Sequence, residues 1–176
     1  MAWTMDPTHS SIEFSVKHMM ISTVRGRFRE FGLTAELDPA DLSKANAQVS
    51  IDVDSIDTRE EGRDKHLRTA DFFDAANHPT INFVSKRFEP KGDGEISIIG
   101  DLTIRGVTKE VTLKGEVSGP QKDPWGGIRM GLSAEGQISR DDFGVNFNAA
   151  LETGGFLVGN NVKILIEAEL VEAKAA

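Results

Sequence analysis

The sequence of 176 residues contains no cysteine, no tyrosine and no long hydrophobic run. Without cysteine, a disulfide bond, a thiol nucleophile, an iron–sulfur cluster and a cysteine-ligated zinc site are all excluded. The apolar stretches are only a few residues long, whereas a membrane-spanning helix requires ~20. A chain of this length buries roughly two-thirds of its surface on folding, so one hydrophobic core suffices to stabilise it. We therefore expect residues 1–176 to form a single domain without a membrane span.

Positive charge is also scarce, because 20 lysine and arginine residues are outnumbered by 28 aspartate and glutamate residues. The formal net charge of −8 argues against nucleic acid as a partner, since phosphate contacts need a basic surface. The same net charge predicts repulsion from an anionic membrane surface. The opening residues, MAWTMDPTHS, lack the basic and apolar segments of a signal peptide, so a cytoplasmic location is expected.

Period-two alternation of apolar and polar residues is the strongest pattern in the chain, and it is typical of β-strands with one buried face. The clearest such segment spans residues 45–56. Similar alternation occurs over residues 12–18, 24–29, 33–37, 80–90, 96–104, 111–117, 128–138 and 162–170. Two prolines and several glycines predict a loop over residues 119–127. The pattern as a whole predicts about eight antiparallel strands joined by short turns.

One interval breaks this alternation and predicts a short helical insertion around residues 58–76. Thr58 is followed three residues later by Glu61, the spacing of a capping box at a helix N-terminus. A second short helix is expected over residues 71–76, ending before Pro79.

Alternating strands in this number form either a two-sheet sandwich or a closed barrel. Glycines inside the strands favour an all-β, eight-stranded antiparallel barrel, because they permit the sharp coiling that closure needs. The small residues of the predicted inward face are Gly26, Ala35, Ala47, Gly100, Gly115, Ala134, Gly136 and Ala168. They either leave an elongated apolar cavity unfilled or mark strand bends, and the sequence supports both interpretations.

Residues arranged for catalysis are missing from the sequence. The four histidines, His9, His18, His66 and His78, include no pair with the spacing of a metal site, so no metal is expected. No nucleophile motif and no phosphate-binding loop occur, so we expect no cofactor and no enzymatic activity. Ten phenylalanines without a tyrosine suit an interior made for hydrocarbon, since a buried tyrosine hydroxyl needs a hydrogen-bond partner.

The densest group of ionisable residues is Arg63, Asp64, His66 and Arg68, within the segment RDKHLR. These residues either contact a polar head group at the mouth of the barrel or form a helix face. In the second case their charges stabilise one another at spacings of three and four residues, and the spacing favours this interpretation.

Four segments resemble the YceI-like family of bacterial, lipocalin-like, polyisoprenoid-binding proteins. They are WTMDPTHSSIEFSVKHMMISTVRGRF, SIDTREEGRDKHLRTADFFDAANHPTINF, GDLTIRGVTKEVTL and DDFGVNF, and together they span nearly the whole chain. The resemblance implies an eight-stranded antiparallel barrel with a helical insertion around a hydrophobic tunnel, which takes a long isoprenoid chain. It also implies a homodimer. Family members are often exported, and that property does not carry over to the sequence shown.

The resemblance and the strand faces together give a set of candidate ligand-binding residues. Those at family motif positions are Phe14, Val16, His18, Phe28, Phe72, Phe73, Phe83, Leu102 and Ile104. Those predicted from strand facing alone are Val49, Ile51, Met130 and Ile164. His18 is either a polar contact in the tunnel or a satisfied core histidine. We therefore expect a non-catalytic protein that binds, stores or transports a long-chain isoprenoid-like lipid. The alternatives are an enzyme that modifies such a lipid in the same cavity, and a ligand-free interaction module.

Overall fold

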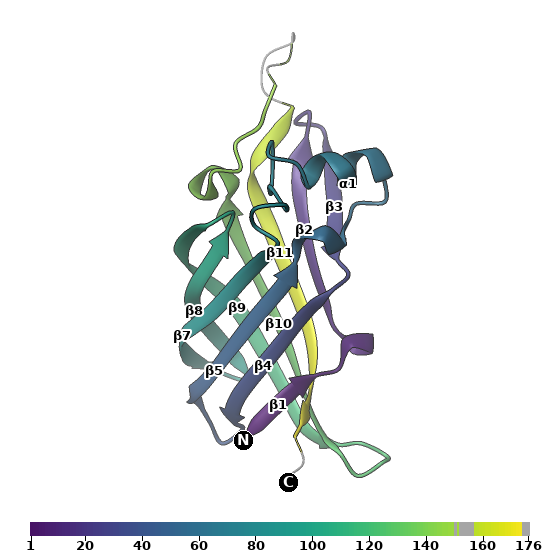
Figure 1. Ribbon diagram of the computed structural model, residues 1–176. Coiled ribbons are helices and arrows are strands. Elements are labelled where there is room, and N and C mark those ends of the chain that lie inside the picture. Colours follow the sequence, from purple (N-terminus) through teal and green to yellow (C-terminus); the bar gives the residue numbers. More distant parts are fainter. Residues whose placement is uncertain (150, 152–156, 174–176) are drawn as a thin grey trace.

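The computed structural model of the chain describes residues 1–149, 151 and 157–173, and within them the chain forms a tall β-barrel (Figure 1). Its strands are β1 (Ala2–Met5), β2 (Ser11–His18), β3 (Ser22–Phe28), β4 (Phe31–Asp38), β5 (Asp41–Asp52), β6 (Ile56–Asp57), β7 (Thr80–Gly92), β8 (Glu95–Ile104), β9 (Val107–Lys122), β10 (Ile128–Ser139) and β11 (Val158–Glu172). The order β1-β4-β5-β7-β8-β9-β10-β11 closes into a ring through an antiparallel pairing of β1 with β11. The expected all-β, eight-stranded antiparallel barrel is confirmed.

Three of the barrel's long strands are interrupted at about the same height. A short 3-10 turn, Pro7–His9, separates β1 from β2, and both of these strands pair with β11. A second 3-10 turn, Val53–Ser55, separates β5 from β6, while β3 and β4 are divided by the residues between them. Asp6 and Asp52 cap the two turns, because each carboxylate accepts a hydrogen bond from the backbone N–H two residues further on. The lower half of the barrel is therefore closed by β1 and β4, and the upper half continues through β2, β3 and β6.

Close packing fills the lower half of the barrel. Trp3 is 1% exposed, and its indole N–H donates to the backbone carbonyl of Leu37 at 3.2 Å. In the strand register Trp3 lies opposite Ala35, and Ala35 lies opposite Ala47. Two of the small inward residues thus stand next to the largest side chain of the interior, where a bulkier residue would compete with the indole for space.

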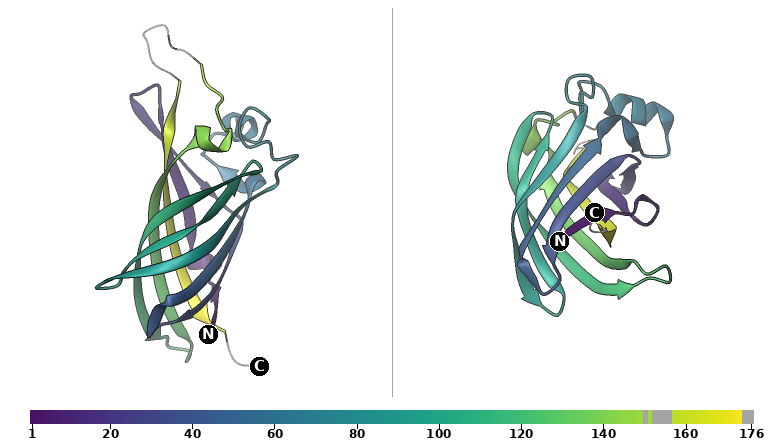
Figure 2. Two further views of the ribbon diagram at one scale, coloured as in Figure 1. Left: turned by 90° about the vertical axis from the view of Figure 1, so that its left-hand side faces the viewer. Right: turned by 60° about the horizontal axis from the view of Figure 1, so that its bottom comes forward.

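The insertion between β6 and β7 contains α1 (Glu61–Leu67), which lies beside the upper part of the barrel (Figures 1 and 2). The predicted capping box is wrong. Glu60 is the N-cap, and its carboxylate accepts from the N–H groups of Gly62 and Arg63. The predicted second helix is also wrong, because the chain makes successive turns after α1 and Asp74 has a φ of 49°, a left-handed backbone that a helix excludes. No helix in the described part of the chain has the length and apolar composition to cross a membrane.

The loop predicted over residues 119–127 is shorter than expected, because β9 continues through Pro120 to Lys122. A register shift between Arg129 and Gly131 on β10 takes up the residues beside this proline, whose missing N–H cannot join a regular ladder. The remaining loop is stabilised by Asp123, which accepts hydrogen bonds from the N–H groups of Trp125 and Gly127.

At the upper end of the barrel, β2 and β3 are joined by a tight turn through Met19, Met20 and Ile21. The N–H of Ile21 donates to the carbonyl of His18 at 3.2 Å. Both central residues have a left-handed backbone, with φ values of 52° for Met19 and 62° for Met20. Such a turn is normally built from asparagine and glycine, because other residues pay about 1–2 kcal/mol each for this conformation.

Candidate functional site

An apolar cavity of about 170 Å³ lies in the upper half of the barrel. Its wall comes from β2, β3, β5, β7 to β11, the α1 insertion and the segment after β10. Almost every lining side chain is a hydrocarbon, and hydrogen bonding along the strands satisfies the backbone groups between them. A cavity of this composition recognises a ligand by removing apolar surface from water, with few directional contacts.

The structure brings eleven of the thirteen candidate ligand-binding residues together around this cavity. They are Phe14, Val16, Phe28, Val49, Ile51, Phe72, Phe73, Phe83, Leu102, Ile104 and Ile164. The other two lie elsewhere. His18 ends β2 at the hairpin tip, and Met130 is buried in the packed lower half, where it lies opposite Leu170. The inward facing of Met130 was predicted, but its height along the barrel depends on the strand register.

Phenylalanine rings form two groups at the cavity. The centroids of Phe14 and Phe28 are 5.5 Å apart, and Phe28 contacts Phe73 edge-on at 6.2 Å. Nearer the α1 insertion, Phe72 and Phe147 lie 5.2 Å apart, and the ring of His66 stands edge-on to both at 5.1 Å. The first group lies across the cavity, and the second packs the insertion onto the barrel.

Several of the small inward residues lie directly against a large side chain and do not border empty space. A Cβ atom added at Gly26 would lie 2.4 Å from the Phe14 ring, and one added at Gly100 would lie 2.5 Å from the Phe83 ring. At Gly136 the same atom would lie 2.6 Å from Leu113. These glycines therefore let rings and branched side chains lie flat against the barrel wall, which neither interpretation of the sequence had anticipated.

The volume of the cavity limits what fits without rearrangement. An apolar cavity of about 150 Å³ holds one benzene molecule. The cavity of about 170 Å³ therefore takes roughly one or two isoprene units between the side chains as they lie. A longer chain enters only if rings of the first phenylalanine group turn aside.

Two of the predicted head-group residues, Arg63 and Asp64, stabilise the loop that leads into α1. The buried Asp64 carboxylate accepts from both the backbone N–H and the hydroxyl of Thr58. The guanidinium of Arg63 donates to the Thr58 hydroxyl at 2.8 Å and to the Thr58 carbonyl at 2.7 Å. Thr58 itself is only 3% exposed, so this network supplies partners that the buried loop requires.

The other two predicted head-group residues also contact the protein. His66 lies 2.8 Å from an Asp71 carboxylate oxygen, and Arg68 donates to the backbone carbonyl of Ile56 at 3.3 Å. The Nε atom of Arg68 is buried without a hydrogen-bond partner among the described residues. Most polar atoms of these four residues thus form hydrogen bonds within the protein. A contact between these residues and a ligand head group stays a prediction.

Arg140 is a lining residue that the sequence analysis missed. It is 6% exposed and begins the 3-10 turn Arg140–Phe143 after β10. Its guanidinium donates to the carbonyls of Val145, Phe147 and Gly159 at 2.8 Å each, and to that of Val158 at 3.3 Å. Burial lowers the pKa of this guanidinium. Arg140 thus ties the segment after β10 to the start of β11, and no pattern in the sequence marks it.

Phe143 and Val145 were also missed as lining residues, although both belong to the quoted motif DDFGVNF. They are 2% and 5% exposed. Gly144 between them has a φ of 73°, so the chain turns there and directs both neighbours into the core. The motif was the available signal, because alternating apolar residues stand on either side of its glycine.

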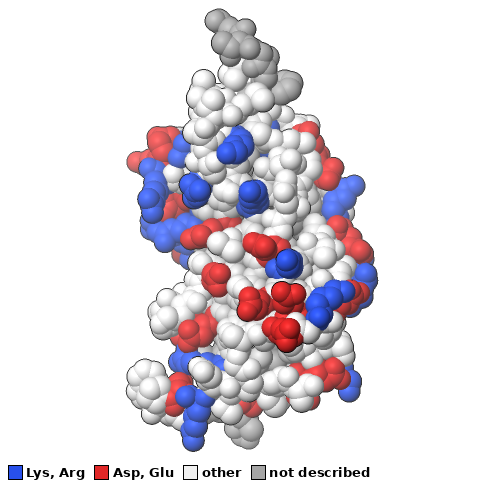
Figure 3. Space-filling view, turned by 180° about the vertical axis from the view of Figure 1, so that it is seen from behind, with Lys and Arg blue, Asp and Glu red and all other residues white. Residues whose placement is uncertain are grey.

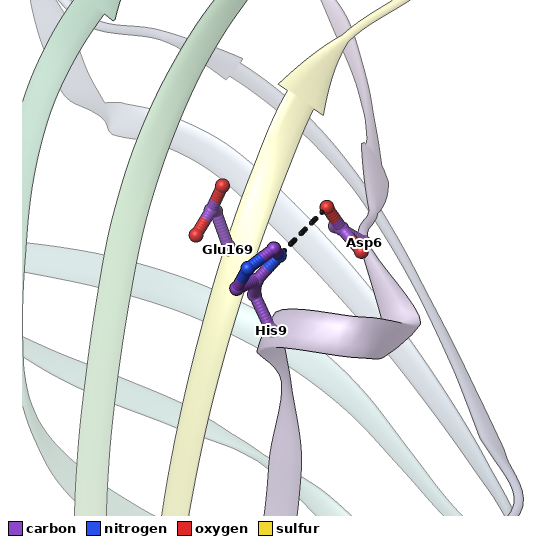
Figure 4. A group of neighbouring side chains, drawn as sticks. All are labelled: Asp6, His9 and Glu169. Carbon is purple, nitrogen blue, oxygen red and sulfur yellow. Dashed lines mark hydrogen bonds and ion pairs between the residues drawn. The ribbon is translucent and has the colours of Figure 1, made fainter.

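Asp6, His9 and Glu169 lie close together on the outer surface, and Figure 4 shows His9 directed toward Asp6. Their ligand atoms lie within 4.8 Å of one another, which suits a metal ion. However, Arg129 donates to Asp6 at 2.8 Å and to Glu169 at 2.7 Å, so a cation already neutralises the two carboxylates. Hydrogen bonds from Thr8, His9 and Arg129 hold the pKa of Asp6 well below its usual range. The arrangement is that of an ion-pair network, which no local pattern indicates because Glu169 is distant from Asp6 along the chain.

A wider groove of about 1140 Å³ runs over the outer face of β2, β3, β10 and β11, on the side seen in Figure 3. Side chains of both charge signs line it, among them Glu13, Arg25, Arg27, Glu135 and Lys163. The groove is larger than the inner cavity, but its open and charged walls do not suit an apolar ligand.

Known proteins resemble this chain over nearly its whole length. A family model described as the YceI-like domain matches residues 3–170. A UPF0312 protein of Staphylococcus aureus is 42% identical over 168 residues, which are 95% of each chain. The solved structure of BcnA from Burkholderia cenocepacia has a TM-score of 0.83 at 27% identity and covers 96% of this chain and 99% of its own. A polyisoprenoid-binding domain from Saccharophagus degradans shares the fold, with a TM-score of 0.73, 15% identity and coverage of 97% and 98%.

Proposed function

Because the chain belongs to the YceI-like domain family, we propose that its barrel binds one apolar chain of isoprenoid type in the upper cavity. The observation that carries this proposal is the hydrocarbon wall inside a closed barrel. Each methylene group moved from water into such a wall contributes about 0.8 kcal/mol, so a chain of moderate length binds without polar contacts. The polyisoprenoid-binding domain of Saccharophagus degradans, which shares the fold, supports this ligand class.

The phenylalanine group supplies the adaptability that a long ligand needs. Phe14 and Phe73 are only partly buried, so their rings have room to turn, whereas Phe28 between them is 7% exposed. Ring rotation exchanges contacts between aromatic neighbours for contacts with the ligand, and the apolar surface stays buried throughout. Rotation of these rings thus enlarges the cavity within the upper half of the barrel, while the packed lower half around Trp3 keeps its shape.

We propose that the protein acts on this ligand by binding alone. Catalysis needs an ionisable or nucleophilic group directed at the ligand. Among the described residues, the ionisable ones at the cavity are Glu13, whose side chain is exposed, and Arg140, whose donors are engaged by backbone carbonyls. Storage and transport are the roles that binding permits, and homodimerisation and a cytoplasmic location remain predictions.

Native mass spectrometry of the protein, followed by organic extraction and titration with a long-chain prenol, tests the proposal. We expect one prenol per barrel. The variant Ile164→Trp fills the cavity and should abolish binding. The matched control Leu165→Trp alters the next residue of the same strand, which faces outward and is 40% exposed, so binding should persist. Failure of the wild type to bind any prenol, or equal binding by both variants, would contradict the proposal. Chemical conversion of the bound prenol would favour the enzymatic alternative.

A further inference from the structure

The tip of the β2–β3 hairpin exposes three consecutive large apolar side chains. Met19, Met20 and Ile21 are 42%, 69% and 83% exposed. Figure 1 shows this hairpin at the upper end of the barrel, beside the start of β11. Single exposed apolar side chains are common on soluble proteins, whereas a contiguous group on a projecting turn marks a contact surface.

The residues at this tip are not those that the backbone favours. Met19 and Met20 occupy two successive left-handed positions, where asparagine and glycine are the usual residues. Neither methionine gains burial in the core that would offset this strain. Among the described residues the N–H of Met19 donates to the carbonyl of Leu157 at 2.8 Å, but this backbone bond does not require a methionine. The choice of two exposed methionines at these positions points to a role outside the fold.

Cationic side chains stand on the outer face just below the tip. Lys17 lies opposite Thr23, and its ammonium group donates to the Thr23 hydroxyl at 3.1 Å. One step further down, Arg25 and Lys163 flank Ser15 on the two neighbouring strands. None of the ion pairs formed among the described residues involves these three cations. On the face seen in Figure 3, basic side chains are prominent in the upper part and acidic ones in the middle.

We propose that the β2–β3 hairpin docks the protein on a lipid bilayer that contains anionic lipids. Met20 and Ile21 enter the boundary between head groups and acyl chains, and Lys17, Arg25 and Lys163 contact lipid phosphate groups. A projecting apolar tip above a belt of cations is the arrangement of an interfacial anchor, since lysine and arginine keep their charged ends at the head-group level.

The net charge of −8 predicted repulsion from such a membrane, but the position of the charges changes this expectation. At physiological ionic strength charges act over about 8 Å, so acidic residues of the middle and lower barrel are screened from a surface at the hairpin tip. Docking also brings the cavity to the lipid. His18 at the tip pairs with Val158, and Val158 and Val16 both line the cavity wall. The inference rests on the hairpin and the neighbouring Lys163 of β11, and it holds whichever apolar ligand the cavity takes.

Co-sedimentation of the full-length protein with phosphatidylcholine vesicles, with and without phosphatidylserine, tests this inference. We expect binding to vesicles with phosphatidylserine that weakens with added salt. The double variant Met20→Asn/Ile21→Ser should reduce partitioning at least about tenfold, because two apolar side chains no longer enter the interface. Asparagine suits the left-handed position, so the hairpin should still fold.

Controls separate docking from other effects. Trp125→Ser removes a side chain that is equally exposed, at 83%, in the loop after β9, and it should leave partitioning unchanged. Lys17→Gln/Arg25→Gln should weaken binding only to vesicles with phosphatidylserine. Full partitioning of Met20→Asn/Ile21→Ser, or no partitioning of the wild type, would overturn the inference. Self-association that the same double variant abolishes would assign the tip to a protein contact instead. Prenol binding in solution, measured on this variant, reports separately on the cavity.

Discussion

Gly26→Ala is a single-methyl change that tests how the barrel wall and the cavity are coupled. The new Cβ atom would lie 2.4 Å and 2.9 Å from two carbons of the Phe14 ring and 2.8 Å from the Thr58 methyl group. Ordinary contact begins at 3.4 Å, so both neighbours must withdraw, the Phe14 ring by about 1 Å and the Thr58 methyl group by about 0.6 Å. Thr58 is held by hydrogen bonds with Asp64 and Arg63, so the Phe14 ring makes the larger movement, into the cavity that it lines.

The expected cost follows from two opposing effects. Overpacking a core costs about 1–3 kcal/mol, while alanine in place of glycine stabilises a strand by about 0.4–1 kcal/mol through the unfolded state. We expect a net loss of about 1–2 kcal/mol in the free energy of unfolding. If the displaced ring excludes one methylene group of the ligand, about 0.8 kcal/mol of binding free energy is lost, and the dissociation constant for a long-chain prenol rises roughly fourfold.

Urea unfolding and prenol titration measure the two effects. Gly32→Ala on β4 is the matched control, because a Cβ atom there meets nothing within 4 Å. It should leave prenol binding unchanged and raise the free energy of unfolding by about 0.4–1 kcal/mol. In the Phe14→Leu background, which lacks the ring, Gly26→Ala should cost much less free energy of unfolding than it does in the wild type. If Gly26→Ala destabilises the Phe14→Leu background as strongly as the wild type, the contact with the ring is not the cause.

Three further predictions concern polar groups. Asp64→Ala leaves the buried N–H and hydroxyl of Thr58 without their acceptor and should lower the free energy of unfolding by about 2–4 kcal/mol, whereas Asp64→Asn, which keeps an acceptor oxygen, should cost much less in the same urea titration. A hydrogen bond from the Arg59 N–H and the guanidinium of Arg29 lower the pKa of Asp57 to about 2. Because this pKa is lower in the folded protein, the charged Asp57 carboxylate stabilises the fold fully above its ordinary pKa of 3.8, and this stabilisation is lost as the pH falls through about 2. Asp57→Asn should therefore lose less stability than the wild type on acidification, which unfolding midpoints measured at each pH will show. Arg140→Met should raise amide hydrogen exchange in residues 140–148 and at the start of β11 and leave β4 and β5 unchanged, since the lost donors serve only those carbonyls; a uniform rise through the barrel would refute a local role.

The sequence predicted the strands because alternation is a local property. Residues 128–138 alternate without interruption and lie within β10. The alternation over residues 45–56 predicts one strand, but β5 ends at Asp52 and the 3-10 turn Val53–Ser55 interrupts the segment. The four residues of β1 are too few to show a period, although Trp3 among them is almost fully buried. The capping box failed for a related reason. Thr58 has the spacing of an N-cap, but its hydroxyl is used by the tertiary contact with Asp64.

The cavity was predictable in composition but not in shape. Facing alone identified Ile51 and Ile164 as inward residues, and both line the cavity. The height of a residue along the barrel depends on the register between strands, which placed Met130 in the packed half. The fit of the Phe14 ring over Gly26 arises from the pairing of these two residues across β2 and β3, and no short-range pattern encodes that pairing.

The closure of the ring between β1 and β11 also constrains how the protein is made. The closing ladder joins only Trp3, Thr4 and Met5 to Glu172, Val171 and Leu170, so its partners are almost a full chain length apart. Until β11 has been synthesised, the incomplete barrel keeps two unpaired edges, on β1 and β10. Such edges accept strands from other chains. Deleting residues 1–5 removes β1 and leaves the edges of β4 and β11 unpaired, so it should favour exchange of strands between copies.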